Sequence, residues 1–212
     1  MNADLILILV VLTNLKLLAS SRLGACIRTA AAQGMLLGLL PLLVHPHTAP
    51  ARVVGLALGS AALKGVVFPW LLFRALREAE VTREVEPYVG YVTSILAGIL
   101  ALAASFWLGG RLALSTLAAS PLLAPTALFS ILAGLFLIVG RKRAVNQVLG
   151  FLVLENGIYT FGVGVIAGIP FLVELGVLLD AFVAVFVMGI AVYHINREFD
   201  HIDADRLDRL KG

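Results

Sequence analysis

Seven apolar runs alternate with short polar breaks along this chain, and each run is about as long as a membrane-spanning helix. Such a helix needs about 20 predominantly apolar residues. The breaks contain charged residues, prolines and glycines, which favour turns. The pattern predicts an all-α, polytopic membrane protein whose residues 1–212 form a single transmembrane domain. The predicted helices cover about 3–20, 24–44, 50–73, 88–109, 121–140, 144–167 and 172–195.

The composition agrees with this reading. Hydrophobic residues make up 60% of the chain, against about 45–50% in soluble domains. The single cysteine, Cys26, excludes an internal disulfide and any multi-cysteine metal site within the chain. The first apolar run has no basic residues before it and no small-residue cleavage site, so we interpret it as the first helix rather than a signal peptide.

Basic residues are concentrated on alternate connections, which predicts an orientation. Two arginines, Arg52 and Arg111, lie on the even-numbered connections. The odd-numbered connections and the C-terminal tail contain twelve basic residues: Arg22, Arg28, Arg74, Arg77, Arg83, Arg141, Lys142, Arg143, Arg197, Arg206, Arg209 and Lys211. Because positive charge stays on the cytoplasmic side, the N-terminus is predicted outside and the C-terminus in the cytoplasm.

Three ionisable residues lie inside the apolar runs, namely Glu155, Asp180 and Lys64. Each costs roughly 2.5–3.5 kcal/mol to insert near the centre of a bilayer. Burial disfavours the charged form of a carboxyl group, and a group that alternates between neutral and charged forms suits a proton relay. Lys64 lies too deep for its stem to reach water, which favours pairing with an acid or an uncharged amine. We therefore predict a proton path through these residues.

Neighbouring polar residues have two open interpretations. Glu174 either joins the proton path or faces water near the outer interface. Asn156 and Tyr159 either share the hydrogen bonds of Glu155 or pack between helices. The chain has no phosphate-binding glycine loop, no His–Cys ligand cluster and no nucleophile with a base. It is therefore expected to contain no active site, cofactor or metal of its own, and to bind no nucleic acid.

The last third of the chain resembles the hydrogenase-4 component E family, the membrane subunits of formate hydrogenlyase-type NiFe hydrogenases. The motifs are Gly-Phe-Leu-Val-Leu-Glu-Asn-Gly over 150–157 and Leu-Leu-Asp ending at Asp180. Residues 141–212 are also distantly similar to the K-type subunit of respiratory complex I and to the C-type subunit of Mrp antiporters. In the K-type pattern the first acid stands where this chain has Leu152, and Glu155 lies three residues later.

The resemblance implies a membrane subunit of a hydrogenase complex in the inner membrane of a prokaryotic cell. Its partners would be antiporter-like pump subunits, a quinone-binding-like subunit and phospholipid, and the NiFe centre and iron–sulfur clusters would belong to partner subunits. Glu155 and Asp180 would relay protons, with Lys64 as their counter-charge and Glu174 as a further acid. Two alternatives remain open: a subunit of an Mrp-type cation/proton antiporter and a purely structural assembly subunit.

Overall fold

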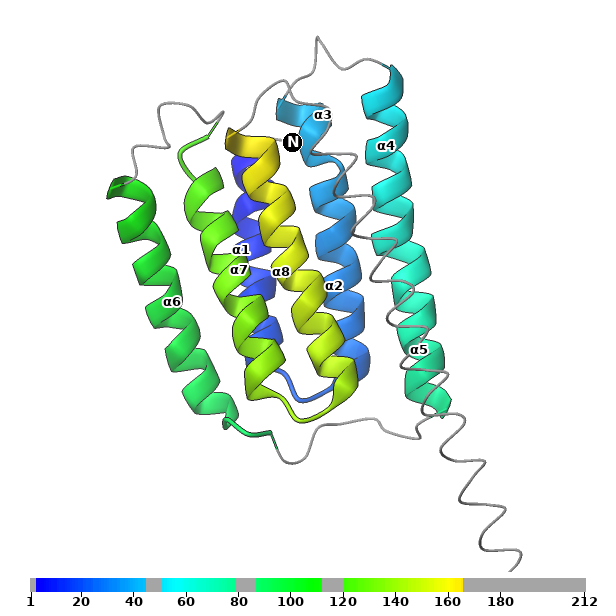
Figure 1. Cartoon of the computed structure of the whole chain (residues 1–212), viewed down its shortest axis with the longest axis vertical. Helices are drawn as coiled ribbons and strands as arrows, with labels where there is room; N and C mark the ends of the chain where they lie inside the picture. The colour runs from blue at the N-terminus through cyan, green and yellow to red at the C-terminus, as the bar shows by residue number, and fades with distance from the viewer. Residues whose placement is uncertain (1–2, 45–50, 79–86, 112–119, 166–212) are drawn as a thin grey trace, which may run out of the picture.

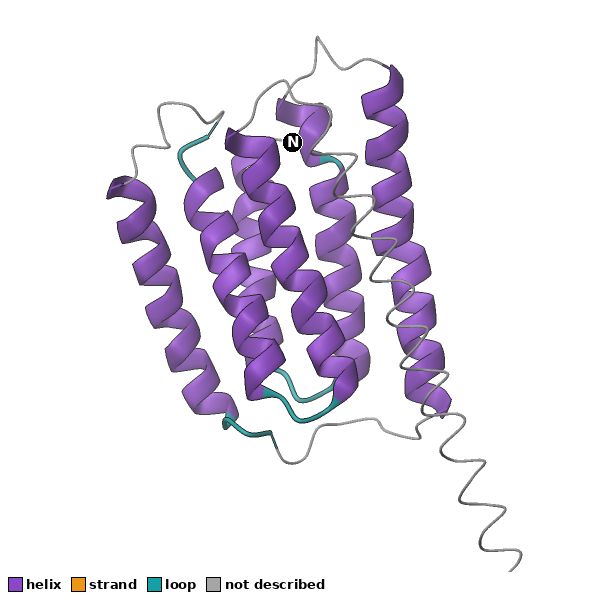
Figure 2. Ribbon diagram, in the orientation of Figure 1, coloured by secondary structure: helices purple, strands orange, loops and turns teal. Residues whose placement is uncertain are grey.

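A computed structural model describes residues 3–44, 51–78, 87–111 and 120–165, which form a bundle of helices (Figures 1 and 2). The all-α class is therefore confirmed for this part of the chain. Two of the described helices, α6 and α7, are long and apolar enough to cross a membrane. The run 172–195 lies outside the described residues. The helices are α1 (Ala3–Ala19), α2 (Leu23–Gly38), α3 (Leu40–Val44), α4 (Ala51–Ala62), the π-helical η1 (Leu63–Val67), α5 (Phe68–Glu78), α6 (Tyr91–Arg111), α7 (Leu123–Gly140) and α8 (Ala144–Val165).

Two predicted helices differ from the observed ones. The run 24–44 divides into α2 and α3, because Pro41 has no N–H to continue the hydrogen-bond ladder and the Leu39 N–H bonds only three residues back, to Leu36 O at 3.3 Å. The run 50–73 continues as helix to Glu78. Arg74 and Arg77 therefore belong to α5 rather than to a connector, since apolar side chains of α5 still pack on the core beyond residue 73.

The helices run up and down beside one another. In Figure 1 the α1–α2 and α7–α8 connections both lie at the lower end, where α5 also finishes and α6 begins. Helices α7 and α8 form the closest pair, α6 packs on α1 and α7, and the α4–η1–α5 segment packs on α2. Helix α8 thus lies between the α7 side of the bundle and the segment that contains Lys64.

A glycine makes the close approach of α7 and α8 possible. A Cβ atom added to Gly134 would lie 2.6 Å from Gly150 O and 2.7 Å from Leu154 Cα, and closer still to Leu154 N. These are backbone atoms of α8, which cannot rotate away as a side chain would. Small residues at such contacts let helix backbones approach closely. Gly134 therefore allows α7 to lie directly against the turn of α8 that precedes Glu155.

Two apolar clusters divide the core along the helix axes. The lower cluster includes Leu17, Ile27, Leu72, Leu149 and Val153, among other buried residues. The upper cluster contains Ile6, Leu7, Val10, Leu37, Leu40, Leu123 and Tyr159. Helices α1, α2, α7 and α8 contribute to both clusters. On each of them, a buried polar side chain lies between the residues of the lower cluster and those of the upper cluster. The polar groups therefore form a layer near the middle of the bundle, enclosed above and below by apolar packing.

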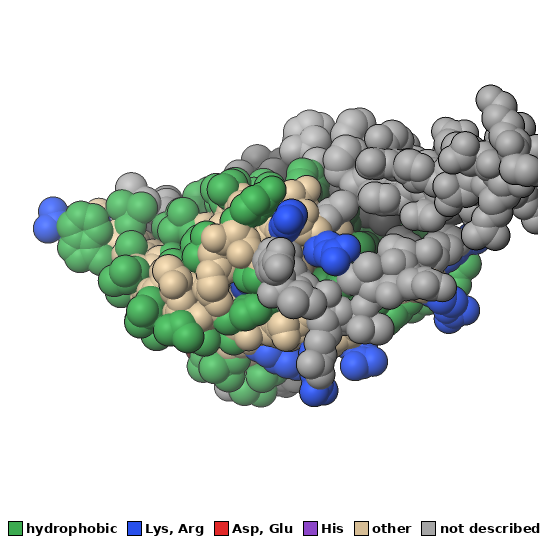
Figure 3. All heavy atoms as spheres, turned by 90° about the horizontal axis from the view of Figure 1, so that it is seen from below, with side chains coloured by type: hydrophobic (Ala, Val, Ile, Leu, Met, Phe, Trp, Pro, Cys, Tyr) green, Lys and Arg blue, Asp and Glu red, His purple; other side chains and the backbone are tan. Residues whose placement is uncertain are grey.

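The described part of the lower end of the bundle has basic side chains. Seen from below, Lys and Arg side chains are visible at several separate places, and no acidic side chain is visible among the described residues on that face (Figure 3). Arg141 is an exception because it is buried: its Nη2 donates to Leu18 O at 2.6 Å, and its guanidinium lies 4.4 Å from the centre of the Tyr91 ring. A cation suits the last carbonyls of α1, where the helix dipole is negative. Arg141 therefore ties α1 to the beginning of α6.

Candidate functional site: a buried charge pair in a polar layer

The structure brings Lys64 and Glu155 together at the middle of the bundle. Lys64 Nζ lies 2.7 Å from Glu155 Oε1, and the two side chains are only 5% and 1% exposed. The residues come from different helical segments, η1 and α8, that are 91 positions apart in the sequence. Because the pair is short and buried, water and salt screen its electrostatic interaction only weakly. The electrostatic attraction between the two groups is therefore strong.

A π-helical turn and a neighbouring glycine position Lys64. Within η1 the Phe68 N–H donates to Leu63 O, five residues back, and Pro69 follows with no N–H of its own. Such π segments are rare and often occur at functional sites. A Cβ atom at Gly34 of α2 would lie 2.5 Å from Lys64 Cβ. The stem of Lys64 thus lies directly against the α2 backbone, and its ammonium group reaches α8.

The other two described residues that the sequence indicated also lie at this pair. Lys64 Nζ donates to Asn156 Oδ1 at 3.1 Å. The same nitrogen lies 5.1 Å from the centre of the Tyr159 ring, within the range of a cation–π interaction. Asp180 and Glu174 lie outside the described residues. In the described part of the predicted path, Lys64 Nζ therefore contacts Glu155, Asn156 and the ring of Tyr159.

Sequence reasoning missed a chain of polar side chains that extends from Asn156 across the bundle. Asn156 Nδ2 donates to Gln33 Oε1 at 3.2 Å, and Gln33 Nε2 donates to Asn14 Oδ1 at 2.7 Å. Asn14 Nδ2 then donates to Ser130 Oγ at 2.8 Å. These residues come from α8, α2, α1 and α7. Asn14, Gln33 and Ser130 are uncharged polar residues within apolar runs, and this is the sequence signal that could have indicated the hydrogen-bonded chain.

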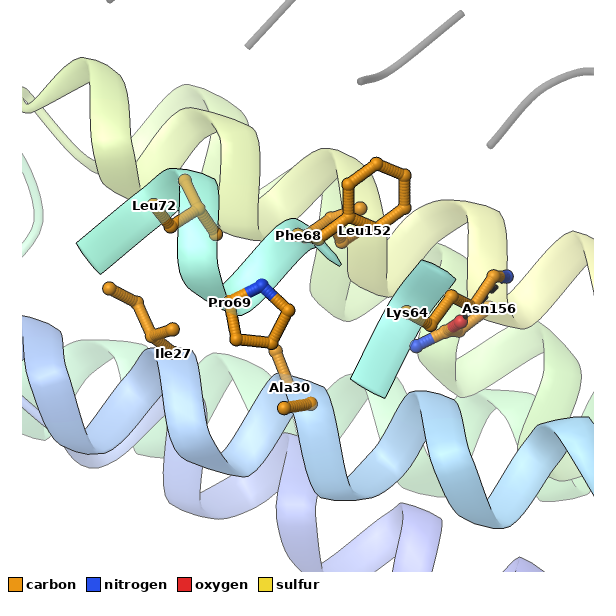
Figure 4. A pocket seen from close by; sticks show the side chains of 9 residues that line it. Ile27, Ala30, Lys64, Phe68, Pro69, Leu72, Leu152 and Asn156 are labelled. Atoms are coloured by element: carbon orange, nitrogen blue, oxygen red, sulfur yellow. Dashed lines mark hydrogen bonds between the residues drawn. The ribbon is translucent and has the colours of Figure 1, made fainter. Parts of the chain in front are cut away.

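A small cavity lies between α2, α8 and the segment that contains Lys64 (Figure 4). Lys64 and Asn156 form its polar end, and the rest of its wall is apolar, including Ile27, Phe68 and Leu152. The cavity has room for about one water molecule. A water molecule there would find its hydrogen-bonding partners at the end where the charge pair lies.

Replacing Gln33 with leucine is expected to lower the free energy of unfolding by about 1–3 kcal/mol, because Asn14 Oδ1 and Asn156 Nδ2 would each lose a buried partner. Denaturant unfolding of the purified chain, followed by circular dichroism, measures this cost. Thr29→Val is the matched control: Thr29 is buried on the same helix, and its hydroxyl bonds to Ala25 O of that helix. Its cost should stay below about 1 kcal/mol, and equal costs would contradict a bridging role for Gln33.

The fold and the site define an all-helical protein with helices of membrane-spanning length and a buried charge pair at its centre. The chain is 33% identical over 190 residues to the uncharacterized protein Rv0085 of Mycobacterium tuberculosis, a match that covers 89% of this chain and 86% of that protein. The chain therefore belongs to the same family as the mycobacterial protein.

A second group of relatives matches part of the chain. Hydrogenase-4 component E of Escherichia coli (strain K12) and that of Shigella flexneri are both 35% identical over 86 residues, which is 41% of this chain and 40% of each relative. A partial resemblance to hydrogenase-4 component E is thus confirmed. No profile of a known protein family and no solved structure matches the chain.

Proposed function

We propose that this chain is a membrane subunit of a hydrogenase complex of the hydrogenase-4 type, in which Glu155 and Lys64 belong to a proton path. The observation on which the proposal rests is the 2.7 Å pair between these residues, buried in a polar layer between two apolar clusters. The partial identity to hydrogenase-4 component E supports the type of complex.

The energetics of the pair favour a role beyond packing. Replacing a buried ion pair with well-packed apolar residues is often neutral or stabilising, so stability alone gives little reason to keep Lys64 and Glu155. A further charge about 6 Å away, at an effective dielectric constant near 20, would change the balance between charged and neutral forms by about 2.8 kcal/mol. Asp180 and Glu174 are our proposed sources of such charges.

The membrane setting is proposed in full from the sequence: seven spanning helices, the N-terminus outside and the C-terminus in the cytoplasm. Two features of the described residues support it. Helix α6 exposes apolar side chains along its length, including Val92 (74%), Leu100 (71%) and Trp107 (62%), and its 21 residues would span about 31 Å. The Lys and Arg side chains that Figure 3 shows among the described residues, seen from below, agree with the predicted cytoplasmic side.

The proposed complex would supply the redox centres that this chain is not expected to contain. Antiporter-like pump subunits and a quinone-binding-like subunit would be its neighbours in a prokaryotic inner membrane, together with phospholipid. The NiFe centre and the iron–sulfur clusters would lie in partner subunits. This chain would then contribute protonatable groups and no redox chemistry.

Glu155→Gln is expected to reduce proton translocation at least tenfold, while hydrogenase activity and assembly of the complex are retained, because glutamine keeps the shape of the side chain and cannot exchange a proton. The complex is purified through a tag on this chain, its subunits are identified, and proton uptake is measured in vesicles. Asp4→Asn is the matched control, since Asp4 pairs with Ser120 at the upper end of α1, away from the polar layer.

Other results would select the alternatives. Unchanged translocation by Glu155→Gln would remove Glu155 from the path. Sodium-dependent transport by a complex without a NiFe subunit would indicate an antiporter. Loss of assembly without this chain, combined with free replacement of Glu155, would indicate a structural subunit.

A further inference from the structure

Four hydrogen bonds of the polar layer follow one another in the same direction across the bundle. Lys64 donates to Asn156, Asn156 to Gln33, Gln33 to Asn14, and Asn14 to Ser130. A protonated lysine has three donors and no acceptor, so Asn156 must turn its oxygen to Lys64 and its NH2 group to Gln33. Gln33 then accepts with its oxygen from Asn156 and donates with its NH2 group to Asn14, and Asn14 accepts and donates in the same way. The Lys64 ammonium group therefore favours one orientation for every amide in the chain. Gln33 Nε2 also donates in that direction to Thr13 Oγ1 at 3.2 Å and to Val10 O at 3.5 Å on α1.

The chain of bonds ends on a backbone group. The Ser130 hydroxyl accepts from Asn14 and donates to Thr126 O of its own helix at 2.8 Å. Asn14, Gln33 and Ser130 are fully buried, and hydrogen bonds in such a low-dielectric interior polarise one another. Primary amides are donors and acceptors but have no proton to release in the physiological pH range. The chain can therefore transmit polarisation, but it cannot conduct protons.

We propose that Asn156, Gln33 and Asn14 are positioning residues that form a polarised amide chain. They orient the Lys64 ammonium group toward Glu155, and they transmit a change in the charge of this pair to α1 and α7. Protons move only on the Glu155 side of Lys64. This inference rests on the proposed function, because it assumes that the charge of the pair changes during turnover.

Isotope-edited NMR can test the inference, because the chain contains only two glutamines, Gln33 and Gln147. Full-length chain with 15N in the glutamine side chains, in lipid nanodiscs, gives two NH2 signals, which are assigned by substituting Gln147. Gln147 is exposed on the first turn of α8, outside the amide chain, and serves as an internal control. Glu155→Gln removes a charge without changing shape and adds a third signal that the wild-type spectrum lacks. Lys64→Met removes the ammonium donor.

Both substitutions are expected to move the Gln33 signal by more than its linewidth and to leave the Gln147 signal in place. Ser130→Ala provides the same test from the opposite end of the chain, should Lys64→Met fail to fold. Thr29→Val, on the same helix as Gln33, should leave both signals unchanged. A Gln33 signal that stays at its wild-type position in Glu155→Gln and in Ser130→Ala would overturn the inference.

The outcome is separable from that of the proposed function. A moving Gln33 signal together with normal proton translocation by Glu155→Gln would support the amide chain and remove the proton path. A fixed Gln33 signal together with lost translocation would overturn the amide chain and leave the proton path standing.

Discussion

Replacing Lys64 with methionine is expected to lower the free energy of unfolding by about 3–5 kcal/mol. The substitution leaves Glu155, 1% exposed, without the ammonium group that lies 2.7 Å from it. Breaking a buried pair by removing one partner is costly because the remaining charge has neither water nor a counter-ion. Equilibrium unfolding of the purified chain in mixed micelles, followed by circular dichroism, measures the change.

Two further variants separate the charge pair from packing. The double variant Lys64→Met/Glu155→Leu is expected to regain most of the lost stability, since replacing both partners with apolar groups is often neutral or better. Lys16→Met, at an exposed lysine in the last turn of α1, should change stability by no more than about 0.5 kcal/mol. If Lys64→Met and the double variant are equally stable, the lost stability comes from the packing of the lysine stem and not from the charge pair.

The second large effect is expected at Gly134, where alanine should lower the free energy of unfolding by about 1–3 kcal/mol. The added Cβ would collide with Leu154 and with Gly150 O of α8, and backbone atoms can give way only if the two helices separate. The same substitution at Gly59 of α4, where an added Cβ meets nothing within 4 Å, should raise stability by about 0.5–1 kcal/mol. Chemical denaturation of both variants gives the comparison.

The informative result is whether Gly134→Ala lowers or raises the free energy of unfolding. A helix gains from Gly→Ala wherever space allows, so a stabilising effect at Gly134 would contradict the close contact of α7 and α8. Because Leu154 precedes Glu155 in the chain, the collision should also move the acid relative to Lys64. We therefore expect the Gly134→Ala variant to lose part of the coupling between Lys64→Met and Glu155→Leu in a double-mutant cycle.

The sequence was sufficient for the helical class and for the charged residues of the site. Glu155 and Lys64 are conspicuous because a charge inside an apolar run is expensive. The depth of Lys64 in its run favoured pairing with an acid, and the structure pairs it with Glu155. Helix positions also followed from the runs, since α1, α7 and α8 begin and end within a few residues of the predicted limits.

The uncharged part of the site could not be predicted in the same way. Asn14 and Gln33 cost less to bury than a charge, and only the arrangement of α1, α2 and α8 brings their amides into one chain. The π turn at Leu63–Val67 packs against α2, and Pro69, which has no N–H, is a local signal just after it. The break between α2 and α3 was missed although Pro41 marks it, because the residues on both sides are apolar.

The two apolar clusters have a consequence for the membrane itself. If the chain spans a membrane as proposed, a continuous water-filled passage through the charged layer would dissipate an ion gradient across that membrane. In the described bundle, apolar clusters lie above and below the charged layer, so apolar packing separates the layer from both ends of the bundle. A change of charge in the proposed proton path would then leave this apolar barrier in place.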